Sequence, residues 1–319
     1  MKKDKIKNIK KPFTGAIVKI LVHVLGKILG AVLYYFDVSH RRTVKRNLKF
    51  IYPEWKDEKI RTISKQVFQN FGITVFEIIQ MYFLKKKNIL SNIHIIRGEE
   101  YLRKAIDGSN GVVLASAHIG NWESAALFVP CYYGKSVVSV ARKIDSAIIN
   151  KVALKMRTRF GNSIINKEGA LPEMTRTVRS GNILAILIDQ NTTASEGVVI
   201  NFFGKKVTAT PAAAMVAIRC NSPVIPAFCI REKNNQLGII FEPPVKITRT
   251  KSLRDDLITN TQAINDVVEK IIREYPDQWL WMHKRWKKFH REIYPEYQSR
   301  HRRIREKTIL KQTKGKDEI

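Results

Sequence analysis

Apolar residues occur along this chain in two kinds of pattern. Short, mostly apolar runs have the length of buried strands, and they lie at 112–117, 136–141, 182–188, 224–230 and 237–241. Elsewhere apolar residues recur at three- and four-residue steps, the spacing of a helix with one buried face, at 41–84, 99–106, 122–129, 146–160, 171–179, 211–220 and 264–272. Strands that alternate with helices predict an α/β fold, with helices packed on a mostly parallel or mixed central sheet.

The segment 13–36 is long and largely apolar, and basic residues flank it on both sides. Lys19, His23 and Lys27 are spaced four apart and form one polar stripe on a helix. They also interrupt the apolar run that a signal peptide needs. We expect a membrane-associated helix that lies in the interface, on the cytosolic side because both flanks are basic. A membrane-spanning helix and a buried helix with a lysine edge are the alternatives.

These patterns divide the chain into three parts. Residues 1–40 are predicted to form a basic leader and membrane-anchoring helix, 41–290 a single α/β domain, and 291–319 a charged basic tail. No stretch of linker composition interrupts the central part, and a chain of this length can bury one large core.

Charge indicates an anionic partner. The chain has 57 Lys and Arg against 28 Asp and Glu, a formal net charge of +29. An anionic membrane surface, acidic proteins, phosphorylated substrates and nucleic acid all fit this charge. We expect no nucleic acid, because no zinc-finger spacing, aromatic RNA-binding motif or basic heptad region occurs.

The three cysteines are Cys131, Cys220 and Cys229. They cannot all pair and show no metal-ligand spacing, so we expect small core thiols in a reducing compartment and no metal site.

The clearest candidate for chemistry is the pair His118 and Glu123. The apolar strand 112–117 ends at the histidine, Gly120 and Asn121 predict a turn, and the glutamate falls in the first turn of the next helix. A carboxylate that holds one imidazole nitrogen leaves the other free to take a proton from a hydroxyl. The alternative is a core histidine satisfied by a nearby acid.

The same spacing occurs twice more, at His94/Glu99 and at His301/Glu306. Neither has the strand, the turn residues and the apolar helix around it, so spacing alone carries little weight. Asp189 also follows an apolar strand, 182–188. Because ligands collect at the carboxyl ends of strands in such sheets, the pattern favours one site shared with His118, although a turn cap is the alternative.

Tryptophan and basic residues interleave in the segment 279–289. This combination is typical of a surface at the level of lipid headgroups, where rings anchor and cations meet phosphates, and it also suits stacked bases.

Taken together, the ordered motifs resemble a known family. They are Ala117-His118-Ile-Gly-Asn-Trp-Glu123, Ala141-Arg142-Lys143, Arg157-Thr-Arg159-Phe-Gly161, Ile188-Asp189-Gln190, Val199-Ile-Asn-Phe-Phe-Gly204, Thr208-Ala-Thr-Pro-Ala212, Pro223-Val-Ile-Pro226 and Gln278-Trp-Leu-Trp-Met-His-Lys-Arg-Trp286. The chain resembles the lysophospholipid-acyltransferase-like superfamily, most closely its late (lauroyl/myristoyl) acyltransferases of bacterial lipid A biosynthesis. The glycerolipid branch usually pairs its histidine with aspartate and carries a Phe-Pro-Glu-Gly-type motif, which is absent around Glu168-Gly169.

The resemblance implies transfer of a fatty acyl chain from acyl carrier protein to a hydroxyl of a phosphorylated glucosamine-based lipid, at the cytosolic face of the inner membrane and without a cofactor. It makes His118 the general base and Glu123 its partner, with Arg142, Arg159 and Asp189 in the surrounding site. Asn191 departs from members that carry an acidic residue there.

A lysophospholipid or another glycolipid is the alternative acceptor. The chain has no Gly-x-Ser-x-Gly nucleophile motif and no Cys-His signal, so we expect direct attack on the thioester without an acyl-enzyme.

Overall fold

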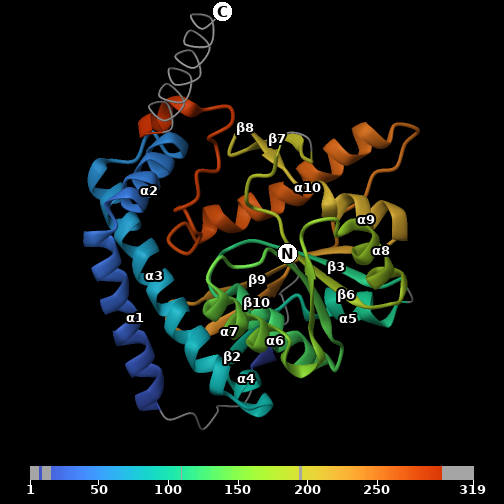
Figure 1. Ribbon diagram of the computed structural model, residues 1–319, viewed down its shortest axis with the longest axis horizontal. Coiled ribbons are helices and arrows are strands. Elements are labelled where there is room, and N and C mark those ends of the chain that lie inside the picture. The colour runs from blue at the N-terminus through green and yellow to red at the C-terminus, as the bar shows by residue number, and fades with distance from the viewer. Residues whose placement is uncertain (1–6, 9–15, 109, 194–195, 297–319) are drawn as a thin grey trace, which may run out of the picture.

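An eight-stranded sheet forms the centre of the molecule in the computed structural model, which describes residues 7–8, 16–108, 110–193 and 196–296 (Figure 1). In spatial order the strands are β1 (Lys7–Asn8), β2 (Ile93–Arg97), β10 (Leu237–Phe241), β9 (Val224–Arg231), β3 (Val112–Ser116), β6 (Ile183–Leu187), β4 (Val137–Ala141) and β5 (Ser163–Asn166). Neighbours pair in parallel except β1 with β2 and β10 with β9. The predicted α/β class with a mostly parallel, mixed sheet is confirmed.

Helices cover both faces of the sheet. One layer contains α5 (Glu99–Asp107), α6 (Trp122–Tyr133) and α7 (Ala147–Arg157), and the other contains α8 (Leu171–Arg179), α9 (Ala212–Cys220) and α10 (Leu253–Glu274). Because successive strand residues point to opposite faces, Val112 and Leu114 of β3 pack in the α5 and α6 cluster, while Val113 and Ala115 pack in the α8 to α10 cluster.

Three helices stand at one side of this body: α1 (Ala16–Phe36), α2 (Val38–Ile51) and α3 (Asp57–Phe83) (Figure 1). Helix α1 runs antiparallel to α3 at very close range. A Cβ on Gly26 would lie 2.4 Å from the Cα of Ile73, and one on Gly72 would lie 2.2 Å from the carbonyl oxygen of Gly26. Only glycine allows two helix backbones to approach this closely.

The outer face of α1 is apolar and open. Ile17 is 79% and Phe36 81% exposed, and the segment Ile17–Phe36 is long and apolar enough to cross a membrane. The alternative of a buried helix with a lysine edge is therefore wrong. The leader residues 1–6 and 9–15 and the tail residues 297–319 lie outside the described residues.

The segment 279–289 does not form the predicted headgroup-level surface. Trp279, Trp281, Trp286 and Arg285 are at most 1% exposed and lie in the core. Each indole N–H donates to an acceptor within the protein, namely Asp189 Oδ2, the carbonyl of Pro276 and the carbonyl of Phe202. Internal acceptors let the polar tips of these rings be buried, so composition alone gave the wrong prediction.

Several short elements also escaped the sequence patterns. They are α4 (Lys86–Asn92), β2, β5, the hairpin of β7 (Val198–Phe202) and β8 (Lys205–Ala209), the 3-10 turns at Arg159–Gly161 and Arg291–Ile293, and β1. The hairpin pairs antiparallel outside the main sheet, and its turn residues Phe203 and Gly204 both have positive φ.

Candidate active site

His118 and Asp189 meet at the carboxyl ends of two adjacent strands. Strands β3 and β6 pair in parallel with Ser116 opposite Leu187, so the residues two positions further along stand side by side. Asp189 Oδ1 lies 2.8 Å from His118 Nδ1, and Asp189 Oδ2 accepts the backbone N–H of His118 at 3.0 Å. The predicted proximity of the two residues is thus observed.

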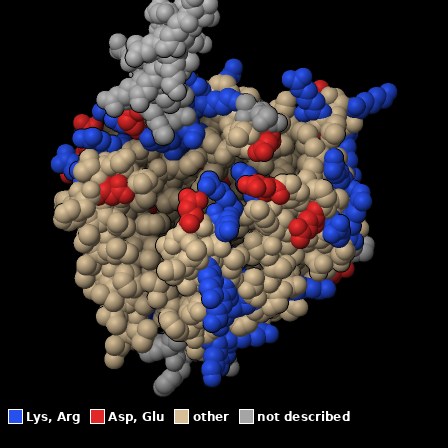
Figure 2. Space-filling view, viewed as in Figure 1, with Lys and Arg blue, Asp and Glu red and all other residues tan. Residues whose placement is uncertain are grey.

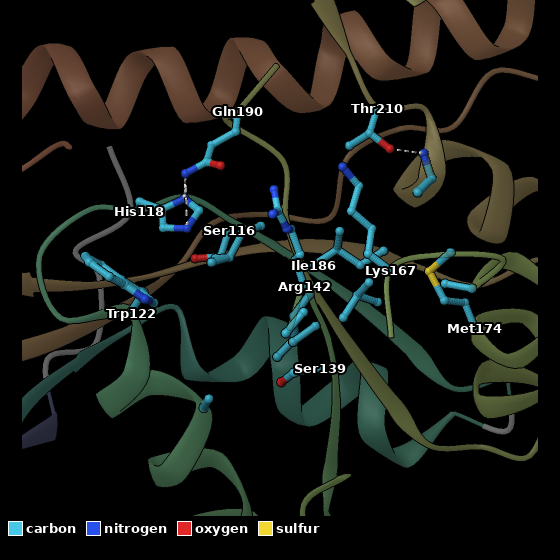
Figure 3. A pocket seen from close by; sticks show the side chains of 18 of the residues that line it. Ser116, His118, Trp122, Ser139, Arg142, Lys167, Met174, Ile186, Gln190 and Thr210 are labelled. Atoms are coloured by element: carbon cyan, nitrogen blue, oxygen red, sulfur yellow. Dashed lines mark hydrogen bonds between the residues drawn. The ribbon is translucent and has the colours of Figure 1, made fainter. Parts of the chain in front are cut away.

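This pairing sets the form of the imidazole. An ionised carboxylate only accepts hydrogen bonds, so Nδ1 carries the proton and Nε2 of the neutral ring keeps a free lone pair. The side-chain amide nitrogen of Gln190 lies 3.5 Å from Nε2, above the ring (Figure 3). The same amide nitrogen is 3.5 Å from Nδ1 as well, so it lies over the face of the ring.

Burial and charge act in opposite directions on the pKa of His118. Burial disfavours the imidazolium, but the adjacent Asp189 carboxylate outweighs burial and raises the pKa of His118 above its usual value. Burial likewise works against the charge on Asp189, but the hydrogen bonds and charge of His118, together with the Trp279 indole, keep the pKa of Asp189 well below its usual range. The histidine is a strengthened base beside a permanently ionised partner.

Trp279 fixes the carboxylate from the far side. Its Nε1–H donates to Asp189 Oδ2 at 2.8 Å, and its neighbour Leu280 donates its backbone N–H to the carbonyl of His118. The carbonyl of Gln278 accepts the N–H of Gly120. The buried segment 278–280 therefore holds both the aspartate and the turn that follows the histidine.

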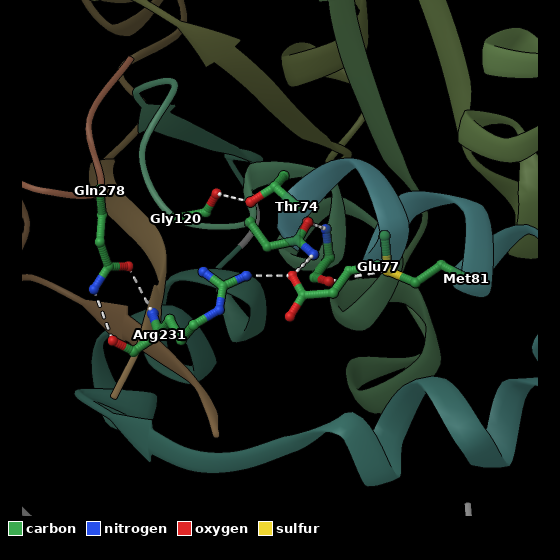
Figure 4. A network of polar contacts seen from close by, with 8 residues as sticks. Thr74, Glu77, Met81, Gly120, Arg231 and Gln278 are labelled. Atoms are coloured by element: carbon green, nitrogen blue, oxygen red, sulfur yellow. Dashed lines mark hydrogen bonds and ion pairs between the residues drawn. The ribbon is translucent and has the colours of Figure 1, made fainter. Parts of the chain in front are cut away.

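The turn itself requires glycine. Gly120 has a φ of +57°, and a Cβ there would lie 2.0 Å from the carbonyl oxygen of Cys229. Helix α3 also contacts this turn, because Thr74 donates its hydroxyl to the carbonyl of Gly120, and Glu77 accepts from the Asn121 side chain and from Arg231 (Figure 4). Asn121 in turn accepts the N–H of Ser124 and caps α6.

Glu123 does not hydrogen-bond to His118 as expected. Its carboxylate, only 8% exposed, accepts from Arg157 Nε at 3.0 and 3.1 Å and from Arg157 Nη2 at 2.5 Å. Glu123 lies in the first turn of α6 and contacts Arg157 at the end of α7, while strand β6, next to β3, brings Asp189 to the ring. The expected imidazole partner is corrected to Asp189, although the charge of Glu123 also raises the pKa of His118.

The two predicted arginines have different positions. Arg142 lines the cavity beside His118 and forms an ion pair with the exposed Asp145 at 3.2 Å. Arg159 does not line the cavity, since its guanidinium donates to the backbone carbonyls of Met81, Tyr82 and Leu84 at the end of α3. Arg157, two residues earlier, lines the cavity instead.

A cavity of about 1380 Å³ opens at His118 and has two differently lined parts. Polar side chains surround the entrance, where Arg142 and Lys167 point into the same space (Figure 3). The apolar part runs between α6 and the sheet and is lined by Leu114, Ala125, Ala126, Val129, Val137, Ala185, Ala227 and Phe241. Small side chains on both the helix and the strands leave this space unfilled.

Four residues of the site were not assigned a role by sequence patterns: Arg157, Lys167, Trp279 and His283. His283 lines the cavity as a neutral ring, because burial and Arg285 lower its pKa to about 4. Arg157, Trp279 and His283 lie within motifs that match the family, which was the available signal for them, whereas Lys167 comes to the site through tertiary packing.

A histidine with a buried carboxylate partner thus lies at a cavity that is polar on one side and apolar on the other. Comparison with known sequences gives the family. The chain belongs to the bacterial lipid A biosynthesis acyltransferase family, whose model matches residues 17–288, and it is an acyltransferase.

The identity to individual relatives is low, but the matched regions are long. A lipid A biosynthesis lauroyltransferase of Escherichia coli K12 is 24% identical over 271 residues, 84% of this chain and 85% of the relative. A lipid A biosynthesis acyltransferase of Haemophilus influenzae is 21% identical over 254 residues, 80% and 78% of the two chains. A phosphatidylinositol mannoside acyltransferase of Mycobacterium tuberculosis is 22% identical over 196 residues, 60% of each chain.

Proposed function

We propose that this protein moves a fatty acyl chain from the thioester of acyl carrier protein to a hydroxyl of a lipid A precursor, at the cytosolic face of the inner membrane. The observation that carries the proposal is the His118–Asp189 pair beside a cavity with an apolar branch. The pair supplies a base, and the branch supplies a place for a hydrocarbon chain.

The chemistry needs no cofactor, because a thioester is already activated. His118 Nε2 takes the proton of the acceptor hydroxyl as its oxygen forms a bond to the thioester carbonyl carbon. The tetrahedral oxyanion collapses, the carbon–sulfur bond breaks, and the same proton passes from Nε2 to the departing thiolate. A positioned base of this kind is typically worth about 10²–10⁴ in rate.

The oxyanion needs a donor close to the base. The side-chain amide of Gln190 and the guanidinium of Arg142 both belong to the cavity lining, and either donor contributes about 10²–10³ in rate if it meets the oxyanion. Glu123 and Arg157 act as a pair in this proposal: each neutralises the other's buried charge, and their carboxylate adds to the basicity of His118.

The apolar branch predicts how chain length is set. Helix α6 runs inward from the base, so Val129 lies about 10 Å deeper than Trp122 at 1.5 Å per residue. Val129→Phe shortens the branch at its deep end, and Ala126→Phe shortens it further toward the mouth. Each excluded methylene is expected to reduce kcat/KM about tenfold or more for the longer donors.

The measurement is kcat/KM for a series of saturated acyl donors. The maximum should move to shorter chains in Val129→Phe and to still shorter ones in Ala126→Phe, while the shortest donors react as with the unaltered enzyme. An unchanged order of donors in both variants would contradict a chain site between α6 and the sheet.

The acceptor is proposed to be a phosphorylated glycolipid. Arg142 and Lys167 provide two cations at the cavity entrance, although Glu168 and Glu196 line it as well. Similarity to phosphatidylinositol mannoside acyltransferases favours a different glycolipid as the second candidate, and a lysophospholipid remains the third. All three share the base and differ in what the entrance contacts.

The open apolar face of α1 supports membrane association, because its side chains are exposed to water without a lipid phase. The basic composition on both sides of this helix favours the cytosolic leaflet.

The deciding experiment is mass spectrometry of lipid A from cells that lack the protein. Loss of one secondary acyl chain, restored by the unaltered gene, is the expected result, and acyl transfer by the purified enzyme should prefer the carrier-protein thioester to acyl-CoA. Unchanged lipid A together with a changed phospholipid or other glycolipid would replace the proposed acceptor by one of the two alternatives.

A further inference from the structure

Helix α7 leaves its apolar face uncovered beside the cavity. Ile148 is 79%, Ile149 58% and Val152 48% exposed. These positions lie on the same side of the helix as Met156, which is four residues after Val152 and is only 2% exposed. The apolar face of α7 is therefore buried at the carboxyl end of the helix and exposed to solvent over its first two turns.

The buried end of α7 is tied to α3 and α4. Met156 packs in one cluster with Met81 and Leu84 at the end of α3 and Ile89 of α4. Arg159 donates to three backbone carbonyls at the end of α3, and Lys155 lies over the ring of Tyr82 at 5.6 Å. These contacts fix the position of α7, including its exposed amino-terminal part, relative to α3 and α4.

The neighbouring end of α3 is also apolar and exposed. Phe83 is 76% and Ile79 50% exposed. The antiparallel packing of α1 on α3 places the first residues of α1, including Ile17 at 79% exposure, toward the same end of this helix pair. Apolar side chains of three helices are therefore open to solvent around one end of the molecule.

Lysines accompany these apolar residues. Segments 79–92 and 142–160 contain three and six Lys or Arg respectively, against the single acidic residue Asp145. Lys85, Lys86, Lys87, Lys151 and Lys155 are exposed. Basic side chains gather over α7 and α4 and lead from the central hollow toward the lower edge of the face in Figure 2. Exposed apolar residues next to exposed lysines suit an anionic lipid surface, where the former enter the acyl boundary and the latter meet headgroups.

We propose that α7, with the adjoining ends of α3 and α4, is a second membrane-inserting surface that seats the cavity entrance on anionic lipid. Arg142 and Ile144 before the helix and Arg157 at its end all line the cavity. Insertion of α7 therefore places the entrance at the level of the headgroups, where a lipid acceptor enters without leaving the bilayer. This goes beyond the proposed anchoring by α1 and rests on the proposed function only for the identity of the acceptor.

An acidic carrier protein is the rival occupant of the lysines. The lysines would attract either partner by charge. The exposed side chains of Ile148, Ile149 and Phe83 favour lipid, because they need an apolar phase to cover them.

The test places an environment-sensitive fluorophore at Ile149→Cys in the full chain, with Cys220→Ser because Cys131 and Cys229 are buried. The matched control carries the same label at Leu253→Cys on α10, another exposed apolar position. Vesicles of phosphatidylglycerol and phosphatidylcholine, with and without a lipid-embedded quencher, should blue-shift and quench the label at 149 and leave the label at 253 unchanged.

Charge provides the second arm. Each lysine near an anionic surface contributes about 1 kcal/mol, a factor of about five, so Lys151→Gln with Lys155→Gln should lower the ratio of inserted to free α7 about 25-fold. Lys206→Gln with Lys246→Gln, two exposed lysines outside α7, should leave it unchanged.

Equal responses at 149 and 253 would overturn the proposal. A response at 149 to apo acyl carrier protein, without one to vesicles, would overturn it in favour of the carrier. The measurement uses no substrate and should give the same result with His118→Ala, so failure of the insertion and failure of the proposed reaction are distinguishable.

Discussion

Replacing His118 by alanine should reduce kcat by about 10³–10⁴ while the KM of both substrates changes little, because the variant loses its base but keeps the cavity. The titratable groups nearest to the ring are poorly suited to take over the proton: Asp189 is buried and ionised, Glu123 is engaged by Arg157, and burial lowers the pKa of His283 to about 4. The measurement is steady-state acyl transfer by purified enzyme.

The matched control is His94→Ala. His94 and Glu99 have the same spacing as His118 and Glu123, but His94 lies outside the cavity and contacts Lys19 at 3.0 Å. This variant should retain activity within about a factor of two, as expected for a partly exposed position without a catalytic role. Undiminished transfer by His118→Ala would remove the general-base mechanism.

Replacing Asp189 by asparagine should cost about 10⁴ in kcat, the effect of presenting the wrong imidazole tautomer. The amide nitrogen of asparagine donates to Nδ1, so the ring proton moves to Nε2 and the free base at the cavity is lost. Loss of the carboxylate charge also lowers the pKa of His118, since Asp189 is what raises it above its usual value.

The sign of the pH effect follows directly. A base works when it is unprotonated, so activity of the unaltered enzyme should fall as the pH drops through the raised pKa of His118. In Asp189→Asn the residual activity should persist to lower pH. A pH–rate profile therefore separates loss of this partner from general damage to the fold, which leaves the acidic limb in place.

Glu123→Gln distinguishes the two acids. It keeps the shape of the side chain but leaves Arg157 without a charged partner, so we expect a smaller loss of kcat, about 10–10², and a small shift of the acidic limb in the same direction. A larger loss in Glu123→Gln than in Asp189→Asn would return the role of imidazole partner to Glu123.

Local patterns were sufficient for much of the fold. The runs 182–188 and 237–241 gave β6 and β10, and 171–179 gave α8. They succeeded because the sheet is buried on both faces, which makes its central strands uniformly apolar, while the covering helices have one apolar side. Strands toward the two ends of the sheet, such as β2 and β5, carry mixed residues and are only partly buried, so they left no comparable signal.

The same reasoning explains what the sequence determined about the site. The end of β3 two residues before His118, the turn at Gly120 and the start of α6 are local features, and a glycine that must adopt positive φ marks them. The sequence thus singled out the histidine that we propose as the base, and it placed Asp189 at the end of another strand of the same sheet.

Only the tertiary structure decided which acid holds the histidine. That depends on β6 being the neighbour of β3 and on the register that sets Ser116 against Leu187. This register brings together His118 and Asp189, which are 71 positions apart in the sequence. The tertiary structure also decided that the tryptophans of 279–289 support Asp189 and the core instead of meeting lipid, while α7 is exposed. Burial is a property of packing between distant segments, and residue composition does not specify it.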